Sequence, residues 1–168
     1  MNITIRKAKF GDEKMLAFIQ TESWKSAFAD IISAEDMERC TDIVKAEAMY
    51  ENVLKSGYAE MSILEIDSKP HCIAAWSKAR NPQFSDCAEL ICIHSLSKNQ
   101  GKGFGSMMLN HIINEIKNSG YNSVLIWVFE KNTRARHFYE KHGFEFTDNT
   151  QISYDAVEVM YRKELCRD

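Results

Sequence analysis

The chain has 168 residues, a formal net charge of −3 and 45% apolar residues, which is the composition of an ordinary globular protein. A negative net charge gives no general electrostatic reason to bind nucleic acid or an anionic membrane. No apolar stretch approaches the roughly 20 residues of a membrane span, and the first residues lack the apolar segment of a signal peptide. We therefore expect one cytoplasmic domain over residues 1–168, with no nucleic-acid or membrane partner.

The first elements are a short strand and a helix. Ile3 and Ile5 alternate with polar residues, which predicts a strand, and Gly11–Asp12 ends it. Asp12 is a favourable N-cap residue, and apolar residues then recur at helical spacing to about Phe28.

A second helical stretch follows. Ser33 and Asp36 resemble a capping box at its start, and Gly57 is a typical C-cap at its end. The residues Cys40–Thr41 fit a helix poorly, so we expect a break there.

Strands follow these helices. The runs Tyr58–Ile66 and His71–Lys78 have strand character and are separated by Asp67–Pro70, which predicts an antiparallel hairpin. Another apolar run, Cys87–Ser95, predicts the next strand.

The pattern then changes to alternating helices and strands. Apolar residues follow a helical period from Gly103 to Gly120, and Val124–Phe129 is a continuous apolar run typical of a strand covered on both faces. Strand, glycine-rich turn, helix and buried strand together predict a βαβ unit with parallel strands. A short helix, Asn132–His142, and two strands, near Phe144–Thr147 and Ser153–Tyr161, complete the chain.

The cysteines and histidines show no metal-binding or disulfide pattern. The five cysteines are odd in number and form no CxxC pair, and the five histidines form no HxxxH or HExxH motif. Cys72 and Cys92 lie in apolar runs, where a cysteine usually acts as a small buried hydrophobic residue. We expect no metal.

The segment Gln100–Ser106 carries the strongest functional signal. It joins a predicted strand to a predicted helix and contains three glycines, an arrangement that binds phosphate through main-chain N–H groups. A P-loop requires Gly-Lys-Ser/Thr, but here Gly103 follows Lys102. A dinucleotide-binding loop requires GxGxxG, but these glycines run GxGxG.

The spacing Gln100-x-x-Gly103-x-Gly105 resembles the Q/R-x-x-G-x-G/A pyrophosphate loop of the GCN5-related N-acetyltransferases, the GNAT superfamily. The preceding run Glu89–Ser97 is similar to the family's E-L-x-x-I-Y-V-x-P strand, although serine replaces valine at position 95 and proline at position 97. Downstream, Trp127–Phe144 contains N-x-x-A and F-Y-x-x-x-G-F motifs similar to the second family signature.

This resemblance implies the GNAT fold. That fold is a mixed α+β architecture with a mostly antiparallel, twisted sheet of about seven strands, one parallel βαβ unit and about four helices. It also implies acetyl-CoA as co-substrate. The residues that it places at the cofactor are Ile93, His94, Ser95, Gln100, Gly101, Lys102, Gly103, Phe104, Gly105, Ser106, Asn132 and Tyr139.

The resemblance also implies catalytic roles. Tyr139 matches the family tyrosine near the coenzyme A sulfur, a general acid, although it also fits an aromatic residue that packs on its helix. Glu89 occupies the position of a general base in histone-type members, on a strand face that alternation shares with Ile91 and Ile93. A carboxylate at the solvated start of the strand is the other interpretation, and Glu130 is a second candidate base.

The acceptor residues are less defined. Trp24 and Phe28 are i,i+4 neighbours that fit either an amine pocket or the core, and Tyr154 with Asp155 is a similar case. We expect an acetyltransferase acting on a primary amine, with a small amine or polyamine favoured and a homodimer as a family tendency. The alternatives are a protein amine as acceptor and a non-catalytic acetyl-CoA sensor.

Overall fold

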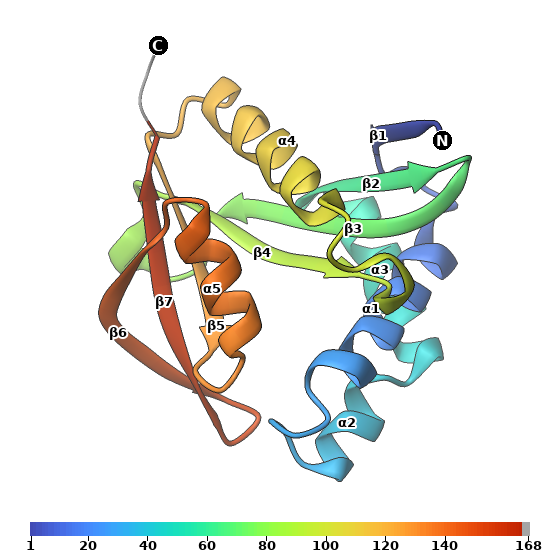
Figure 1. The fold of residues 1–168 in the computed structure, drawn as a ribbon, viewed down its shortest axis with the longest axis horizontal. Helices are drawn as coiled ribbons and strands as arrows, with labels where there is room; N and C mark the ends of the chain where they lie inside the picture. The colour runs from blue at the N-terminus through green and yellow to red at the C-terminus, as the bar shows by residue number, and fades with distance from the viewer. Residues whose placement is uncertain (166–168) are drawn as a thin grey trace.

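A computed structural model describes residues 1–165 as a seven-stranded sheet with helices on both faces (Figure 1). The strands lie in the order β1-β2-β3-β4-β5-β7-β6, and every neighbouring pair is antiparallel except β4–β5. Their bounds are β1 Ile3–Lys7, β2 Glu60–Ile66, β3 Lys69–Lys78, β4 Ala88–Ser95, β5 Ser123–Phe129, β6 Glu145–Ser153 and β7 Ala156–Glu164. The predicted α+β class and the single parallel βαβ unit are confirmed.

Five α-helices are described: α1 Glu13–Ala27, α2 Ala34–Cys40, α3 Ile43–Ser56, α4 Phe104–Asn118 and α5 Thr133–Lys141. The predicted break near Cys40–Thr41 is confirmed, since it divides the second helical stretch into α2 and α3, and the described helices thereby exceed the about four that the family resemblance implied. The Ser33 hydroxyl accepts a hydrogen bond from the Asp36 N–H at 3.0 Å, which confirms the cap of α2.

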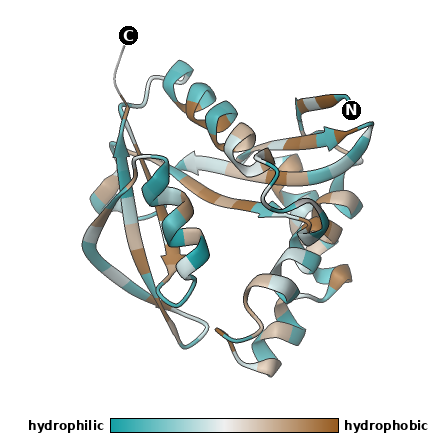
Figure 2. Cartoon of the chain, in the orientation of Figure 1, coloured by the Kyte–Doolittle hydropathy of each residue, from teal (hydrophilic) through white to brown (hydrophobic). Residues whose placement is uncertain are grey.

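Two apolar layers form the core on the two faces of the sheet. Under α4 and α5, buried residues such as Leu90, Met108 and Ile112 pack together. Under α1 and α3, Leu16, Ile63 and their neighbours form the second layer. In Figure 2 the hydrophobic colour is concentrated on the central strands, whereas α5 is largely hydrophilic.

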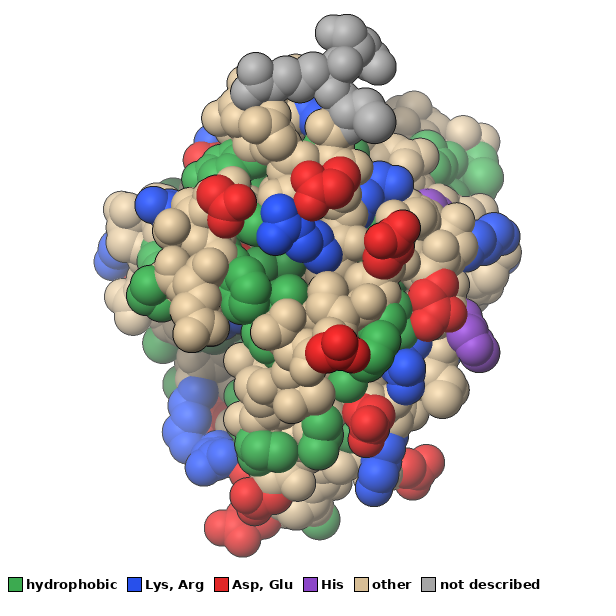
Figure 3. Space-filling view, turned by 90° about the vertical axis from the view of Figure 1, so that its left-hand side faces the viewer, with side chains coloured by type: hydrophobic (Ala, Val, Ile, Leu, Met, Phe, Trp, Pro, Cys, Tyr) green, Lys and Arg blue, Asp and Glu red, His purple; other side chains and the backbone are tan. Residues whose placement is uncertain are grey.

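The edge of the sheet formed by β6 is mostly exposed. Its large apolar residues Phe146 and Ile152 are 50% and 68% exposed. Figure 3 shows this side of the molecule, where acidic, basic and hydrophobic side chains are interspersed. Within the described residues, no helix is both long and apolar enough to cross a membrane.

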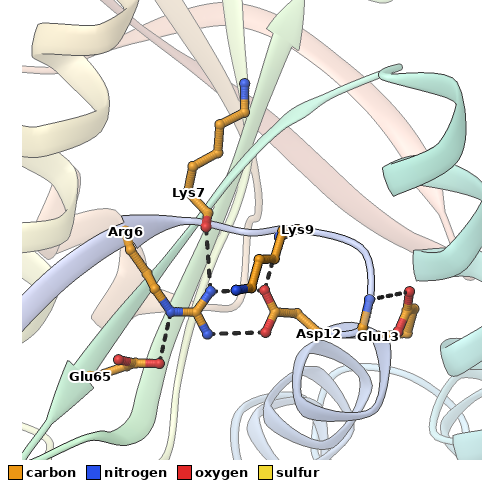
Figure 4. Close-up of polar contacts among 7 residues, drawn as sticks. Arg6, Lys7, Lys9, Asp12, Glu13 and Glu65 are labelled. Carbon is orange, nitrogen blue, oxygen red and sulfur yellow. Dashed lines mark hydrogen bonds and ion pairs between the residues drawn. The ribbon is translucent and has the colours of Figure 1, made fainter.

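The start of α1 is held by an ion-pair cluster (Figure 4). Asp12 is the N-cap residue by position, but its carboxylate does not cap the helix. Instead it accepts hydrogen bonds from the Arg6 guanidinium at 2.8 and 3.0 Å, and Arg6 also donates to Glu65 at 2.9 Å. The predicted N-cap position is therefore confirmed, but the Asp12 carboxylate is engaged by the nearby cation and does not cap the helix. The cluster ties α1 to β1 and β2.

Both hairpin turns are tighter than predicted. Asp67–Ser68 alone forms the β2–β3 turn with φ of 49° and 63°, so Lys69 already begins β3. Tyr154–Asp155 forms the β6–β7 turn with φ of 51° and 55°, and Ser153 belongs to β6 rather than to β7. Two consecutive positive φ values match the twist of a two-residue hairpin, which Asp accepts better than most residues.

A bulge in β4 determines the shape of the site. Trp76 pairs with Leu90 and Ala75 with Cys92, so Ile91 is an extra residue in β4. Ile91 and Cys92 both pack towards the α1–α3 side, and Ile93 turns to the α4 side. The expectation that Ile93 shares a face with Glu89 and Ile91 is therefore wrong, because the bulge resets the alternation.

Beyond the bulge, β4 separates from β5. The two strands pair only at Ala88–Val124 and Glu89–Leu125. In Figure 1 the strands β5, β7 and β6 run almost at right angles to β2, β3 and β4. The residues of β4 after Glu89 thus leave their main-chain groups on this side without a strand partner.

Candidate functional site

A cavity of about 1330 Å³ lies where β4 and β5 separate. Its lining comes from α1, α3, β4, the β4–α4 loop, α5 and the β6–β7 hairpin. Of the residues predicted from the sequence, the following line it: Trp24, Phe28, Glu89, Ile93, His94, Ser95, Gln100, Gly101, Gly103, Phe104, Gly105, Ser106, Asn132 and Tyr139. The structure therefore brings the cofactor, catalytic and acceptor candidates to one cavity.

The glycine-rich loop presents the start of α4 to this cavity. Gly101 and Gly103 have φ of 80° and 86°, a conformation that residues with a Cβ rarely adopt. Gly103 is the N-cap position of α4 and provides no side chain, so the first N–H groups of the helix have no side-chain acceptor. Uncapped N–H groups and the helix dipole favour an anion here, which fits a diphosphate.

The side chains of two loop residues, Phe104 and Lys102, have interactions outside the loop. Phe104 is only 4% exposed, and its ring packs on His71 at 5.3 Å, so its side chain belongs to the core and only its main chain serves the loop. Lys102 is the predicted cofactor residue that is absent from the cavity lining among those described. Its positive charge lies near His71, where burial and then Lys102 lower the pKa of the imidazole.

The β4 residues after the bulge form one wall of the cavity. Ile93, His94 and Ser95 line it, and their main chain is unpaired on the β5 side. An extended ligand arm can therefore hydrogen-bond to β4 as an added strand would. The His94 Nε2 atom accepts a hydrogen bond from the Trp24 indole at 3.4 Å, and burial lowers the His94 pKa to about 4. The imidazole is therefore neutral at pH 7.

α5 brings Asn132 and Tyr139 to the cavity. Asn132 caps the helix, since its Oδ1 atom accepts from the Ala135 N–H at 3.2 Å. Tyr139 is 5% exposed and packs on Phe138 and Phe144. Burial raises the pKa of its phenol well above the ordinary value, with smaller contributions from Cys92 and Cys72. The hydroxyl therefore keeps its proton at neutral pH.

Glu89 is buried and paired with a partner that the sequence did not indicate. It is only 2% exposed, which excludes the interpretation as a solvated carboxylate. Its carboxylate accepts from the Arg80 main-chain N–H at 2.9 Å and from the Arg80 Nε at 3.0 Å. Glu130, the rival base, is exposed and lies outside the cavity lining among the described residues.

The far end of the cavity is aromatic. Trp24 contacts Phe28 at a ring separation of 5.0 Å and Tyr154 of the β6–β7 hairpin at 5.6 Å. Phe28 in turn contacts Phe129 at 5.1 Å. These rings join α1 to β5 and to the hairpin across the cavity. Trp24 and Phe28 thus serve packing and lining at once.

Charged side chains also line this end. Arg39 pairs with Asp36, Lys45 lies 3.7 Å from Asp42, and Arg80 pairs with Glu89. Glu158 on β7 differs, because its carboxylate accepts from the neutral Gln151 amide at 2.6 Å.

The family model for the acetyltransferase (GNAT) family matches residues 22–144. The chain belongs to this family. The uncharacterized N-acetyltransferase YuaI of Bacillus subtilis (strain 168) is 25% identical over 159 residues, which are 94% of this chain and 86% of that protein. The family assignment makes this GNAT protein an acetyltransferase that uses acetyl-CoA.

Solved GNAT structures share the fold. The PaiA N-acetyltransferase of Thermoplasma acidophilum, solved with coenzyme A, superposes with a TM-score of 0.83 at 22% identity, covering 98% of this chain and 99% of that one. YncA of Salmonella typhimurium, solved with its cofactor acetyl-CoA, superposes with a TM-score of 0.74 at 19% identity, covering 99% and 95%.

Two of the described cysteines are thiols with raised pKa values. Cys40, Cys72, Cys87 and Cys92 are free, and Cys166 lies outside the described residues. Burial raises the pKa of Cys72 to about 11 and that of Cys92 to about 12, so both are thiols rather than reactive thiolates at neutral pH. No group of three potential metal ligands occurs in the part of the chain that the structure describes.

Proposed function

We propose that this GNAT enzyme acetylates a primary amine on a small molecule, and that it favours acceptor molecules that carry a second cationic group. Glu158 carries the proposal: among the described carboxylates that line the cavity, Asp42 and Glu89 each have a cation within 4 Å, whereas Glu158 is hydrogen-bonded to the neutral Gln151 amide. A carboxylate beside aromatic faces stabilises an ammonium group through charge and cation–π attraction. The contact between Trp24 and Tyr154 supports a small acceptor, because it bridges the far end of the cavity.

The cofactor has a defined place in this proposal. Acetyl-CoA supplies the thioester. The uncapped start of α4 and the loop Gln100–Ser106 would hold its diphosphate, the unpaired main chain of Ile93 and Ser95 its pantetheine arm, and Asn132 the same arm from α5.

The acceptor must lose a proton before it attacks. An alkylammonium with a pKa of about 10.4 is neutral in only about one molecule in two thousand at pH 7, which costs roughly 4–5 kcal/mol. Glu89 is the proposed base, directly or through one water. Tyr139 is the proposed acid, since it is among the residues that line the cavity and its protonated phenol would donate to a departing thiolate.

The acceptor class is tested with labelled acetyl-CoA against polyamines, amino acids, aminoglycosides and peptides. With the best small diamine as acceptor, we expect Glu158→Gln to raise KM about tenfold or more and to change kcat less. The reason is that the substrate loses a charge-assisted contact. Glu145→Gln, an exposed change on β6, is the control. Turnover of peptides alone would point to a protein acceptor. Binding of acetyl-CoA without turnover of any amine would point to a sensor.

A further inference from the structure

One face of α5 lies along the cofactor loop. Residues at four-residue intervals on this helix each contact a loop or α4 residue. The Arg134 guanidinium donates to the Gln100 side chain, and His142 hydrogen-bonds to Ser106. Between them, the Phe138 ring lies 3.5 Å from where a Cβ on Gly105 would be. The helix that carries Tyr139 therefore also supports the start of α4.

The hydrogen bonds of His142 fix which of its nitrogens carries a proton. Nδ1 lies 2.7 Å from the Phe138 carbonyl oxygen, which can only accept, so Nδ1 bears a hydrogen. Nε2 lies 2.9 Å from the Ser106 hydroxyl. In a neutral imidazole Nε2 has no hydrogen, so the Ser106 hydroxyl must donate to it.

This direction matters because Ser106 lines the cavity in the first turn of α4. While its proton is directed to His142, Ser106 presents only lone pairs to an anion. If Nε2 is protonated, it donates to the Ser106 oxygen and the hydroxyl proton is free to turn to a phosphate oxygen. The two states differ by one proton on His142.

We propose that His142 is a positioning residue for the cofactor, and that coenzyme A binding takes up a proton at His142 so that Ser106 can donate to the diphosphate. The proposal rests on the placement of the diphosphate at the start of α4. A histidine can change charge between pH 5 and 8, so the linkage acts in the physiological range. Affinity should fall as the pH rises, because the proton becomes harder to acquire.

Charged side chains of α5 and β7 lie near His142. From β7, Lys163 Nζ donates to the His142 carbonyl at 2.7 Å, and Lys141 is the last residue of α5, directly before His142. The Glu140 carboxylate accepts from the Tyr161 hydroxyl at 2.7 Å. From α4 the ring faces the uncharged Ser106.

The test is calorimetry of dephospho-coenzyme A binding from pH 5.5 to 8.5, in pairs of buffers with different ionisation enthalpies. This ligand lacks the phosphate monoester, whose second pKa of about 6 would otherwise add its own titration. For the wild type we expect uptake of a fraction of a proton near pH 7, and affinity about tenfold lower at pH 8 than at pH 6, since a hydrogen bond to a charged acceptor is lost.

Two variants separate positioning from packing. Ser106→Ala should bind with the weaker affinity at every pH and take up no proton at this site. In His142→Gln, the amide N–H can donate to Ser106 at any pH, so affinity should be independent of pH. A wild type with no proton uptake, or with the same pH dependence as Ser106→Ala, overturns the proposal. A wild type that binds no ligand at any pH instead overturns the placement of the cofactor.

Discussion

At the residue scale, the burial of Tyr139 keeps its hydroxyl protonated and so able to act as an acid. Its phenol pKa is raised by burial, so the group remains an acid throughout the neutral range. Tyr139→Phe keeps the ring contacts with Phe138 and Phe144 but removes the hydroxyl. We expect kcat to fall by about 10²–10⁴, the usual range for an acid–base group, with coenzyme A affinity little changed.

Steady-state kinetics in a regime limited by chemistry, together with calorimetry, measure both quantities. Tyr121→Phe is the matched control, since Tyr121 packs on Trp76 and lies outside the cavity lining among the described residues. An unchanged kcat in Tyr139→Phe would leave Tyr139 with a packing role only.

Glu89 is tested by the pH dependence of the reaction. Glu89→Gln retains a group that can accept from Arg80 but cannot take up the ammonium proton. We expect kcat/KM to lose its acidic limb, and raising the pH to restore part of the rate because more acceptor arrives neutral. Glu130→Gln, at an exposed carboxylate, should keep the wild-type profile. If Glu89→Gln also keeps rate and profile, the base is a water relay.

At the element scale, the loop and βαβ unit were predictable because their signals are local. Glycine spacing and the helical period of α4 are both properties of neighbouring residues. The bulge in β4 was not predictable from the sequence. Ile91 and Cys92 are both apolar, and a strand buried on both faces has no alternation of apolar and polar residues that a bulge would interrupt. Arg80 was missed because its pairing with Glu89 depends on the β3–β4 register.

At the scale of the whole molecule, the acceptor end is built from segments far apart in the chain. Trp24 of α1 meets Tyr154 of the last hairpin, and Arg39 lies 6.0 Å from the same Tyr154 ring. No local pattern specifies such a contact, so the sequence indicated these residues without showing that they enclose one cavity. The expected homodimer stays a prediction.

The stability of the fold should depend on His94 in acid. Burial lowers its pKa to about 4 in the folded protein, whereas an unfolded histidine has a pKa of about 6.5. As the pH falls through this window, the unfolded chain takes up the proton first. Neutral His94 therefore makes its full contribution to the stability of the fold above pH 6.5, and this contribution is lost as the pH approaches 4. Between pH 7 and 4.5 this linkage removes about 2 kcal/mol from the free energy of unfolding.

Urea unfolding of the wild type and of His94→Gln at both pH values measures this loss. We expect the wild type to lose about 2 kcal/mol more than the variant over that interval, because glutamine has no proton to gain. The pKa of His71 is also lowered by burial, but it contributes equally to both proteins and cancels in the difference. His137→Gln, at an exposed histidine on α5, should behave as the wild type does. Equal losses in the wild type and His94→Gln would show that His94 becomes charged in the folded protein as easily as in the unfolded chain. In that case the Trp24–His94 contact would tolerate an imidazolium, and the cavity wall formed by β4 would carry a positive charge in mild acid.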